Sequence, residues 1–170
     1  MVPNNRFGFT LVEMLVVTGI MLLTTGFGVA RYNDYTQQRR LNQEAKEFTS
    51  VMELASKRAV SGDSTTACAD FQGIQVSMAP SGTYTMRRCC EGACNSAQST
   101  VYNTYPLPTG ITLSAPTATT TYLFNKLTQT ITVNPAANQT VTFRNTVSSR
   151  CLSVTVSPAG LINLGTEIAC

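Results

Sequence analysis

The feature that most constrains this chain is an apolar run of 22 residues near its start, residues 9–30, which carries a single charge, Glu13. A helix of that length reaches roughly 33 Å, about the thickness of a bilayer core. The run therefore predicts a helix that spans a membrane. Two other interpretations stay open. A cleaved secretory signal would use the small residues Gly28 and Ala30, although its apolar region is normally shorter, and a buried core helix rarely lacks a polar face.

A second, amphipathic stretch follows in residues 31–61. Between Tyr35 and Ala59 it has no Gly or Pro and is rich in helix-forming residues. Its apolar residues recur every three or four positions, which predicts one apolar stripe along a helix. Gly62 is a typical residue just after a helix C-terminus. The two stretches together predict one helix of about 50 residues, whose stripe either forms a coiled coil or packs on the domain that follows. The stripe consists of Leu41, Ala45, Phe48, Met52, Ala55 and Ala59, widened by Val51 and Leu54.

The remaining part, residues 62–170, is rich in Thr, Ser and Asn, and its sequence predicts β structure. Short alternating or β-branched runs are separated by turns that contain Pro and Gly. This spacing is typical of an antiparallel sheet, and a sheet with one apolar face needs a cover. We therefore expect an α+β fold. A long N-terminal helix, membrane-embedded in its first half and amphipathic in its second, packs on an antiparallel sheet. The expected strands are 74–79, 83–87, 111–114, 122–125, 130–133, 140–144, 152–157 and 161–164.

All six cysteines lie in this β-rich part, which indicates disulfides formed in an oxidising exterior. They are Cys68, Cys89, Cys90, Cys94, Cys151 and Cys170. Six cysteines allow 15 pairings. Cys151 begins an expected strand and Cys170 follows its hairpin partner, so those two could meet, and Cys68 would then pair within the 89–94 cluster. A metal cluster is the alternative, but paired Cys-x-x-Cys knuckles and His are absent from the sequence. We expect neither a metal nor a cofactor.

Composition excludes several classes of protein. The chain has no His, which removes every catalytic triad that needs an imidazole base and every His-ligated zinc site. Its net charge of +3 is too small for a basic nucleic-acid-binding arm, and the sequence has no phosphate-binding loop. We expect no enzymatic activity. Four arginines, Arg87, Arg88, Arg144 and Arg150, could still form a patch that contacts phosphates.

A short motif at residues 8–13, Gly-Phe-Thr-Leu-Val-Glu, decides the class of protein. It resembles the leader of type IV pilins and type II secretion pseudopilins, which ends in Gly and is followed by an aromatic residue and by Glu at the fifth position after the Gly. The resemblance implies that a membrane-embedded prepilin peptidase cleaves after Gly8 and methylates the new amine of Phe9. The implied segments are a leader (1–8), a transmembrane and assembly half of the helix (9–30), an amphipathic half (31–61) and a β-rich head outside the cytoplasm (62–170).

The carboxylate of Glu13 needs a partner, since a charge inside a membrane helix costs about 2.5–3.5 kcal/mol. The resemblance implies that Glu13 of one subunit faces the Phe9 amine of a neighbour as subunits leave the bilayer and stack. The alternative is that Glu13 reaches back to the membrane interface. The implied partners are other pilin or pseudopilin subunits, prepilin peptidase, the inner-membrane assembly platform and the membrane. The implied location is a single pass through the inner membrane with the head outside, and later an extracellular or periplasmic fibre.

The end of the helix and the C-terminal strands, residues 48–62 and 152–162, resemble those of minor pseudopilins. Ser56 stands where that subgroup often has Arg. The resemblance implies a structural subunit, minor or tip-located, of a type IV pilus or a type II secretion pseudopilus. One alternative is a major pilin. Another is a minor pilin that acts as a DNA receptor in natural DNA uptake, with the four arginines as nucleic-acid contacts. A third, an anchored domain that never polymerises, conflicts with the presence of both Glu13 and the Gly8-Phe9 pair.

Overall fold

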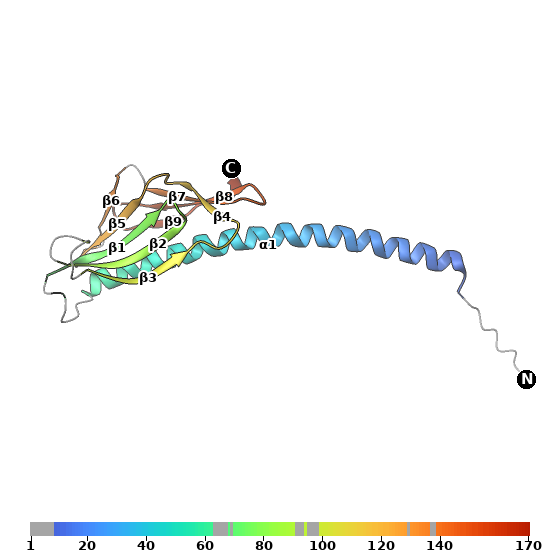
Figure 1. Ribbon diagram of the computed structural model, residues 1–170, viewed down its shortest axis with the longest axis horizontal. Coiled ribbons are helices and arrows are strands. Elements are labelled where there is room, and N and C mark those ends of the chain that lie inside the picture. Colours follow the sequence, from blue (N-terminus) through green and yellow to red (C-terminus); the bar gives the residue numbers. More distant parts are fainter. Residues whose placement is uncertain are drawn as a thin grey trace, which may run out of the picture. The chain divides into compact units, whose positions relative to one another are not determined.

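The computed structural model describes residues 9–62, 68, 70–90, 94, 99–128, 130–136 and 139–170, with only the backbone described for residues 27–31. The chain divides into two compact units, Met1–Thr36 and Gln37–Cys170. Helix α1 (Leu11–Ser61) contributes residues to both units, and the strands all belong to the second (Figure 1). The strands are β1 (Phe71–Ala79), β2 (Thr83–Cys90), β3 (Thr100–Pro106), β4 (Ile111–Ala115), β5 (Thr120–Asn125), β6 (Ile131–Asn134), β7 (Thr140–Asn145), β8 (Arg150–Val156), β9 (Ile162–Leu164) and β10 (Ile168–Ala169).

The long helix predicted from the sequence is confirmed, since α1 has 51 residues. It ends where the sequence indicates. Gly62 follows the last helical residue with a φ of +64°, a conformation that glycine adopts without steric cost. The N–H of Gly62 donates a hydrogen bond to the carbonyl oxygen of Ala59 at 3.3 Å, which satisfies one of the last carbonyl groups of the helix.

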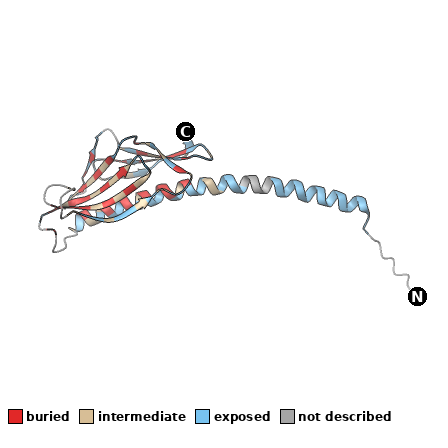
Figure 2. Ribbon diagram, viewed as in Figure 1, coloured by how far each residue is buried: buried red, intermediate tan, exposed pale blue. Residues whose placement is uncertain are grey.

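The apolar stripe of α1 is buried inside the second unit. All six residues of the predicted stripe, from Leu41 to Ala59, are fully buried, and Val51 is buried beside them (Figure 2). Leu54, which was expected to widen the stripe, is 38% exposed. The stripe is covered by strands of the same chain, so it packs on the domain that follows, which was one of the two predicted alternatives.

The strands form two antiparallel sheets. Sheet A has the order β3-β2-β1-β5-β6, and sheet B has the order β10-β8-β7-β4, with β9 also paired to β8. The α+β class with antiparallel strands is confirmed. The division into two sheets was not predicted. Strand β4 belongs to sheet B, where it pairs with β7 instead of with the strands next to it in sequence. Local periodicity carries no information about such a long-range pairing.

Two strands, β3 and β10, were not predicted. The burial along β3 does not alternate, since its partly buried residues are Tyr102 and Tyr105, three positions apart. The pairing of β3 with β2 shifts register between Met86 and Arg87, which is a bulge that breaks the period of two. The other missed strand, β10, contains only two residues.

Phe48 of α1 lies where the helix and the two sheets meet. Its ring centroid is 5.3 Å from that of Tyr84 in sheet A and 5.6 Å from that of Phe143 in sheet B, both in edge-to-face geometry. Tyr84 in turn stacks on Tyr105, with ring centroids 5.0 Å apart. Aromatic pairs of this kind contribute about 0.5–1.5 kcal/mol beyond the apolar area that they bury. The amphipathic half of α1 is therefore an integral part of the head.

Candidate functional site

The start of α1 holds the residues that the sequence identifies as the processing and assembly site. Gly8 lies outside the described residues. Phe9 is exposed, and the helix begins two residues later at Leu11. Thr10 caps it, because its hydroxyl oxygen accepts a hydrogen bond from the N–H of Glu13 at 3.3 Å. Thr10 and Glu13 have the spacing of a capping box, a local signal that the sequence analysis missed. The Glu13 carboxylate has no hydrogen-bond partner among the described residues.

Large apolar side chains between Leu11 and Leu23 are exposed by 41–81% in the first unit. They include Leu11, Val12, Met14, Leu15, Val16, Val17, Ile20, Met21, Leu22 and Leu23. A contiguous apolar surface of this kind marks a site that contacts lipid or another protein. In the described residues, no stretch of helix is both long and apolar enough to cross a membrane. The predicted span, 9–30, includes side chains 27–30, which lie outside the described part.

Small and hydroxyl residues interrupt this apolar surface. Thr18, Thr24 and Thr25 each donate a hydrogen bond from their hydroxyl group to a carbonyl oxygen of the preceding turn, at 2.7–3.1 Å. Their polar groups are therefore satisfied within the helix. A Cβ atom added at Gly19 or Gly26 would meet no other atom within 4 Å. The helix thus offers uncovered backbone at which a second helix can approach closely.

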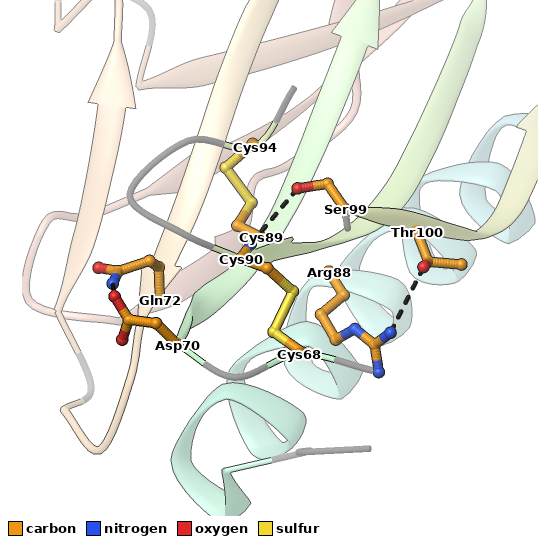
Figure 3. The surroundings of a disulfide bond; sticks show 9 residues. All are labelled: Cys68, Asp70, Gln72, Arg88, Cys89, Cys90, Cys94, Ser99 and Thr100. Carbon is orange, nitrogen blue, oxygen red and sulfur yellow. Dashed lines mark hydrogen bonds between the residues drawn. A yellow bond between two sulfur atoms is a disulfide. The ribbon is translucent and has the colours of Figure 1, made fainter. Parts of the chain in front are cut away.

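The head contains three disulfides, Cys68–Cys90, Cys89–Cys94 and Cys151–Cys170, and none of the six cysteines is free. The last of these is the pair that the sequence suggested, and Cys68 pairs within the 89–94 cluster. The Cys89–Cys94 pair was not foreseen. Figure 3 shows how the neighbouring residues Cys89 and Cys90 connect to two different partners. In the described part of the chain, no group of His, Cys, Asp or Glu side chains could hold a metal ion.

The four arginines considered as nucleic-acid contacts lie on different sheets. Arg87 and Arg88 are in β2 of sheet A, whereas Arg144 and Arg150 are in β7 and β8 of sheet B. Arg88 is 5% exposed and donates a hydrogen bond to the Thr100 hydroxyl at 3.4 Å (Figure 3).

The other three arginines differ in how they are engaged. Arg87 donates to the Cys94 carbonyl at 3.0 Å, and Arg150 forms an ion pair with Glu167 at 2.8 Å. Arg144 is exposed. The four arginines are therefore not four free guanidinium groups on one surface.

Glu44 is a buried acid that the sequence analysis missed. It is 5% exposed, and its Oε1 atom accepts a hydrogen bond from the Tyr84 hydroxyl at 3.4 Å. Burial, together with the nearby charge of Glu47, raises the pKa of Glu44 from 4.5 to about 7, although the hydrogen bond from Tyr84 opposes the shift. Burial also raises the pKa of Tyr84 above its usual range, so its hydroxyl stays protonated.

A polar cluster ties the first helical residues of the second unit to sheet B. The amide of Asn145, which is fully buried, donates to the carbonyl oxygen of Gln37 at 3.1 Å and to its side-chain oxygen at 3.2 Å. The Asn145 Oδ1 atom accepts hydrogen bonds from the N–H groups of Val147 and Ser148 at 2.9 and 3.0 Å. Every hydrogen-bonding position on this buried amide is therefore used.

The C-terminal segment is held against the same helix. Glu167 accepts a hydrogen bond from Asn42 of α1 at 3.3 Å through the carboxylate that also pairs with Arg150. The Cys151–Cys170 disulfide and the pairing of β10 with β8 fix the residues that follow.

Comparison with protein families assigns the N-terminal segment. Residues 3–29 match the model of the prokaryotic N-terminal methylation motif. The chain carries the leader signature of type IV pilins and pseudopilins. The leader signature that the sequence predicts at the start of the chain is therefore confirmed. A comparison with curated proteins and one with solved structures gave no significant match.

The pilin leader signature covers the residues singled out at the start of the chain, which are Gly8, Phe9 and Glu13. It indicates a structural subunit that is processed by prepilin peptidase and assembles with other pilin-type subunits. It also indicates a protein that is anchored in a membrane before it reaches a surface fibre. The match ends at residue 29 and does not include the head. It therefore does not distinguish a pilus subunit from a subunit of a secretion pseudopilus.

Proposed function

We propose that this chain is a structural subunit, minor or tip-located, of a type IV pilus or a type II secretion pseudopilus. The observation that carries the proposal is the pilin leader signature at residues 3–29. Two features support it, the exposed apolar surface of α1 that follows the leader and the disulfide-bonded head. Since the role is structural, the chain needs no catalytic residue.

Processing begins at the leader, residues 1–8. Prepilin peptidase cleaves the bond after Gly8 and methylates the new amine of Phe9. Phe9 is exposed and precedes the first helical residue, Leu11, which supports access of a peptidase to this position. Residues 9–30 hold the subunit in the inner membrane, and residues 31–61 join this segment to the head, residues 62–170. The disulfides favour a head outside the cytoplasm.

Assembly moves the apolar part of α1 from lipid into a core shared with other subunits. Its exposed aliphatic side chains supply the apolar area, and Gly19 and Gly26 permit close approach of helices. The Glu13 carboxylate pairs with the Phe9 amine of a neighbouring subunit and so sets the register. The absence of any other hydrogen-bond partner for this carboxylate among the described residues supports that role.

The minor or tip-located role rests on the likeness of residues 48–62 and 152–162 to minor pseudopilins. Subunit counting in purified fibres tests it. A minor subunit is present at a small fraction of the abundance of the main subunit, whereas equal or greater abundance would make this chain the major pilin.

Measurement of the intact mass and the N-terminal residue of the protein from its native membrane tests whether the chain is a pilin-type subunit. The proposal expects a chain that begins at methylated Phe9. A chain that begins at Met1, in cells where prepilin peptidase processes a control substrate, would contradict the proposal.

Glu13→Ala tests the assembly role. The variant should insert into the membrane normally and be cleaved, but it should be depleted from fibres. Glu53→Ala, at an exposed position in the head part of α1, is the matched control and should enter fibres like the wild type. Equal incorporation of both variants would remove Glu13 from the mechanism.

A further inference from the structure

A groove opens on the head between α1 and the segment that joins β3 to β4, and it has a volume of about 480 Å³. The helix contributes one wall, and the opposite wall is rich in proline. The lining includes Arg40, Glu44 and Glu47 from the helix and Pro106, Pro108 and Thr109 from the facing segment.

The buried carboxyl group in this groove is incompletely paired. The hydrogen bond from Tyr84 to Oε1 of Glu44 is long, and the other oxygen, Oε2, has no hydrogen-bond partner among the described residues. Arg40 lines the same groove four residues earlier on the helix, yet it forms no ion pair with Glu44 in the described part. Burial and the nearby carboxylate of Glu47 disfavour the ionised form of Glu44. A cation that entered the groove would stabilise that ionised form.

We propose that this groove binds a lysine side chain of a neighbouring subunit, whose ammonium group pairs with Glu44 and Glu47. The two acids, Glu44 and Glu47, outnumber the single cation of the groove, Arg40. The charge of the groove therefore complements that of an ammonium group. The aliphatic stem of the lysine lies along Pro106 and Pro108, which supply an apolar wall.

A lysine fits this site better than an arginine does. A guanidinium group binds a carboxylate best through two parallel hydrogen bonds, one to each oxygen. In Glu44 the Oε1 atom already accepts a hydrogen bond from Tyr84, so a guanidinium group bound to both oxygens would have to share Oε1 with Tyr84. An ammonium group is compact, and it can donate one bond to Oε2 and another to the adjacent carboxylate of Glu47.

That the lysine belongs to another pilin-type subunit rests on the proposed function. That the groove binds a lysine side chain does not. The first test therefore uses the full chain alone in detergent micelles, with N-acetyl-lysine methylamide as the probe. Carboxyl carbon NMR follows the titration of Glu44, with its signal identified by loss in Glu44→Gln. The same probe with its ε-amino group acetylated is the matched control.

The lysine probe should lower the pKa of Glu44 by about 1 or more, as an opposite charge at ion-pair distance does. The acetylated probe should leave it unchanged. Glu47→Gln should weaken binding of the lysine probe several-fold, and Glu53→Gln, at an exposed position on the same helix, should not.

Three results would overturn the proposal. The first is a pKa of Glu44 that does not respond to the lysine probe at tens of millimolar, and the second is an equal response to the acetylated probe. The third is a pKa that is already low and rises in Arg40→Gln, which would show that Arg40 itself fills the groove. Because this experiment needs no fibre, its failure leaves the pilin assignment intact, and the mass of the Phe9 terminus tests that assignment separately.

Discussion

Replacing Glu44 with Gln should remove a pH dependence from the stability of the head. In the folded state, burial raises the pKa of Glu44 to about 7, against 4.5 for the free carboxyl group. The folded protein therefore binds one more proton than the unfolded chain between these two values. Its free energy of unfolding falls as the pH rises through this window, and the loss is complete above pH 7.

The size of this effect follows from the two pKa values. A difference of this magnitude corresponds to about 3 kcal/mol at most. The groove admits solvent to one side of the carboxylate, so we expect about 2 kcal/mol between pH 5 and pH 8. The titratable or charged groups near Glu44 are Glu47 and Arg40, which line the same groove, and Tyr84 of β2, which donates a hydrogen bond to it. Tyr84 stays neutral across this window because burial raises its pKa.

The assay is urea unfolding of the full chain in detergent micelles at pH 5 and pH 8, followed by tyrosine fluorescence, since the chain has no Trp. Glu44→Gln keeps the shape of the side chain and still accepts a hydrogen bond from Tyr84, but it does not titrate. It should match the wild type at pH 5 and be more stable by about 2 kcal/mol at pH 8.

Glu53→Gln is the matched control, because Glu53 is exposed on the same helix, and it should keep the pH dependence of the wild type. A Glu44→Gln variant whose stability changes with pH as much as that of the wild type would refute the argument.

Three further predictions concern the packing of the head, and all are measured by urea unfolding of the full chain. Phe48→Ala should destabilise it by about 3–5 kcal/mol, because this ring fills the junction of the helix and both sheets. Asn145→Ala should cost about 1–3 kcal/mol, since it leaves the Gln37 carbonyl and two turn N–H groups without their partner. Replacing Cys151 and Cys170 together by Ala should cost about 3 kcal/mol, as expected for a bridge that closes a loop of this length. A cost below about 1 kcal/mol for Phe48→Ala or the disulfide variant, or no measurable cost for Asn145→Ala, would contradict these contacts.

The helix and its buried stripe could be predicted because both depend on local chemistry. Spacings of three and four residues between Leu41 and Ala59 define one face of a helix, and the structure buries that face completely. The separation of the strands into two sheets could not be predicted in this way. It includes the pairing of β4 with β7, a contact between segments far apart in sequence. Such a pairing is a non-local contact, and it depends on how side chains from the whole core pack together.

Two of the acidic residues of α1, Glu13 and Glu44, show what periodicity can reveal about a site. Glu13 lies in an apolar run, and its charge marked it as functional from the sequence. Glu44 falls next to Ala45 and between Leu41 and Phe48, inside the buried stripe, so the same reasoning applies to it. A carboxylate on the apolar face of a helix costs free energy when it is ionised there, unless a cation reaches it. Neither acid has an ion-pair partner among the described residues. We propose that another subunit supplies a positive group to each of them, a terminal amine to Glu13 and a lysine to Glu44.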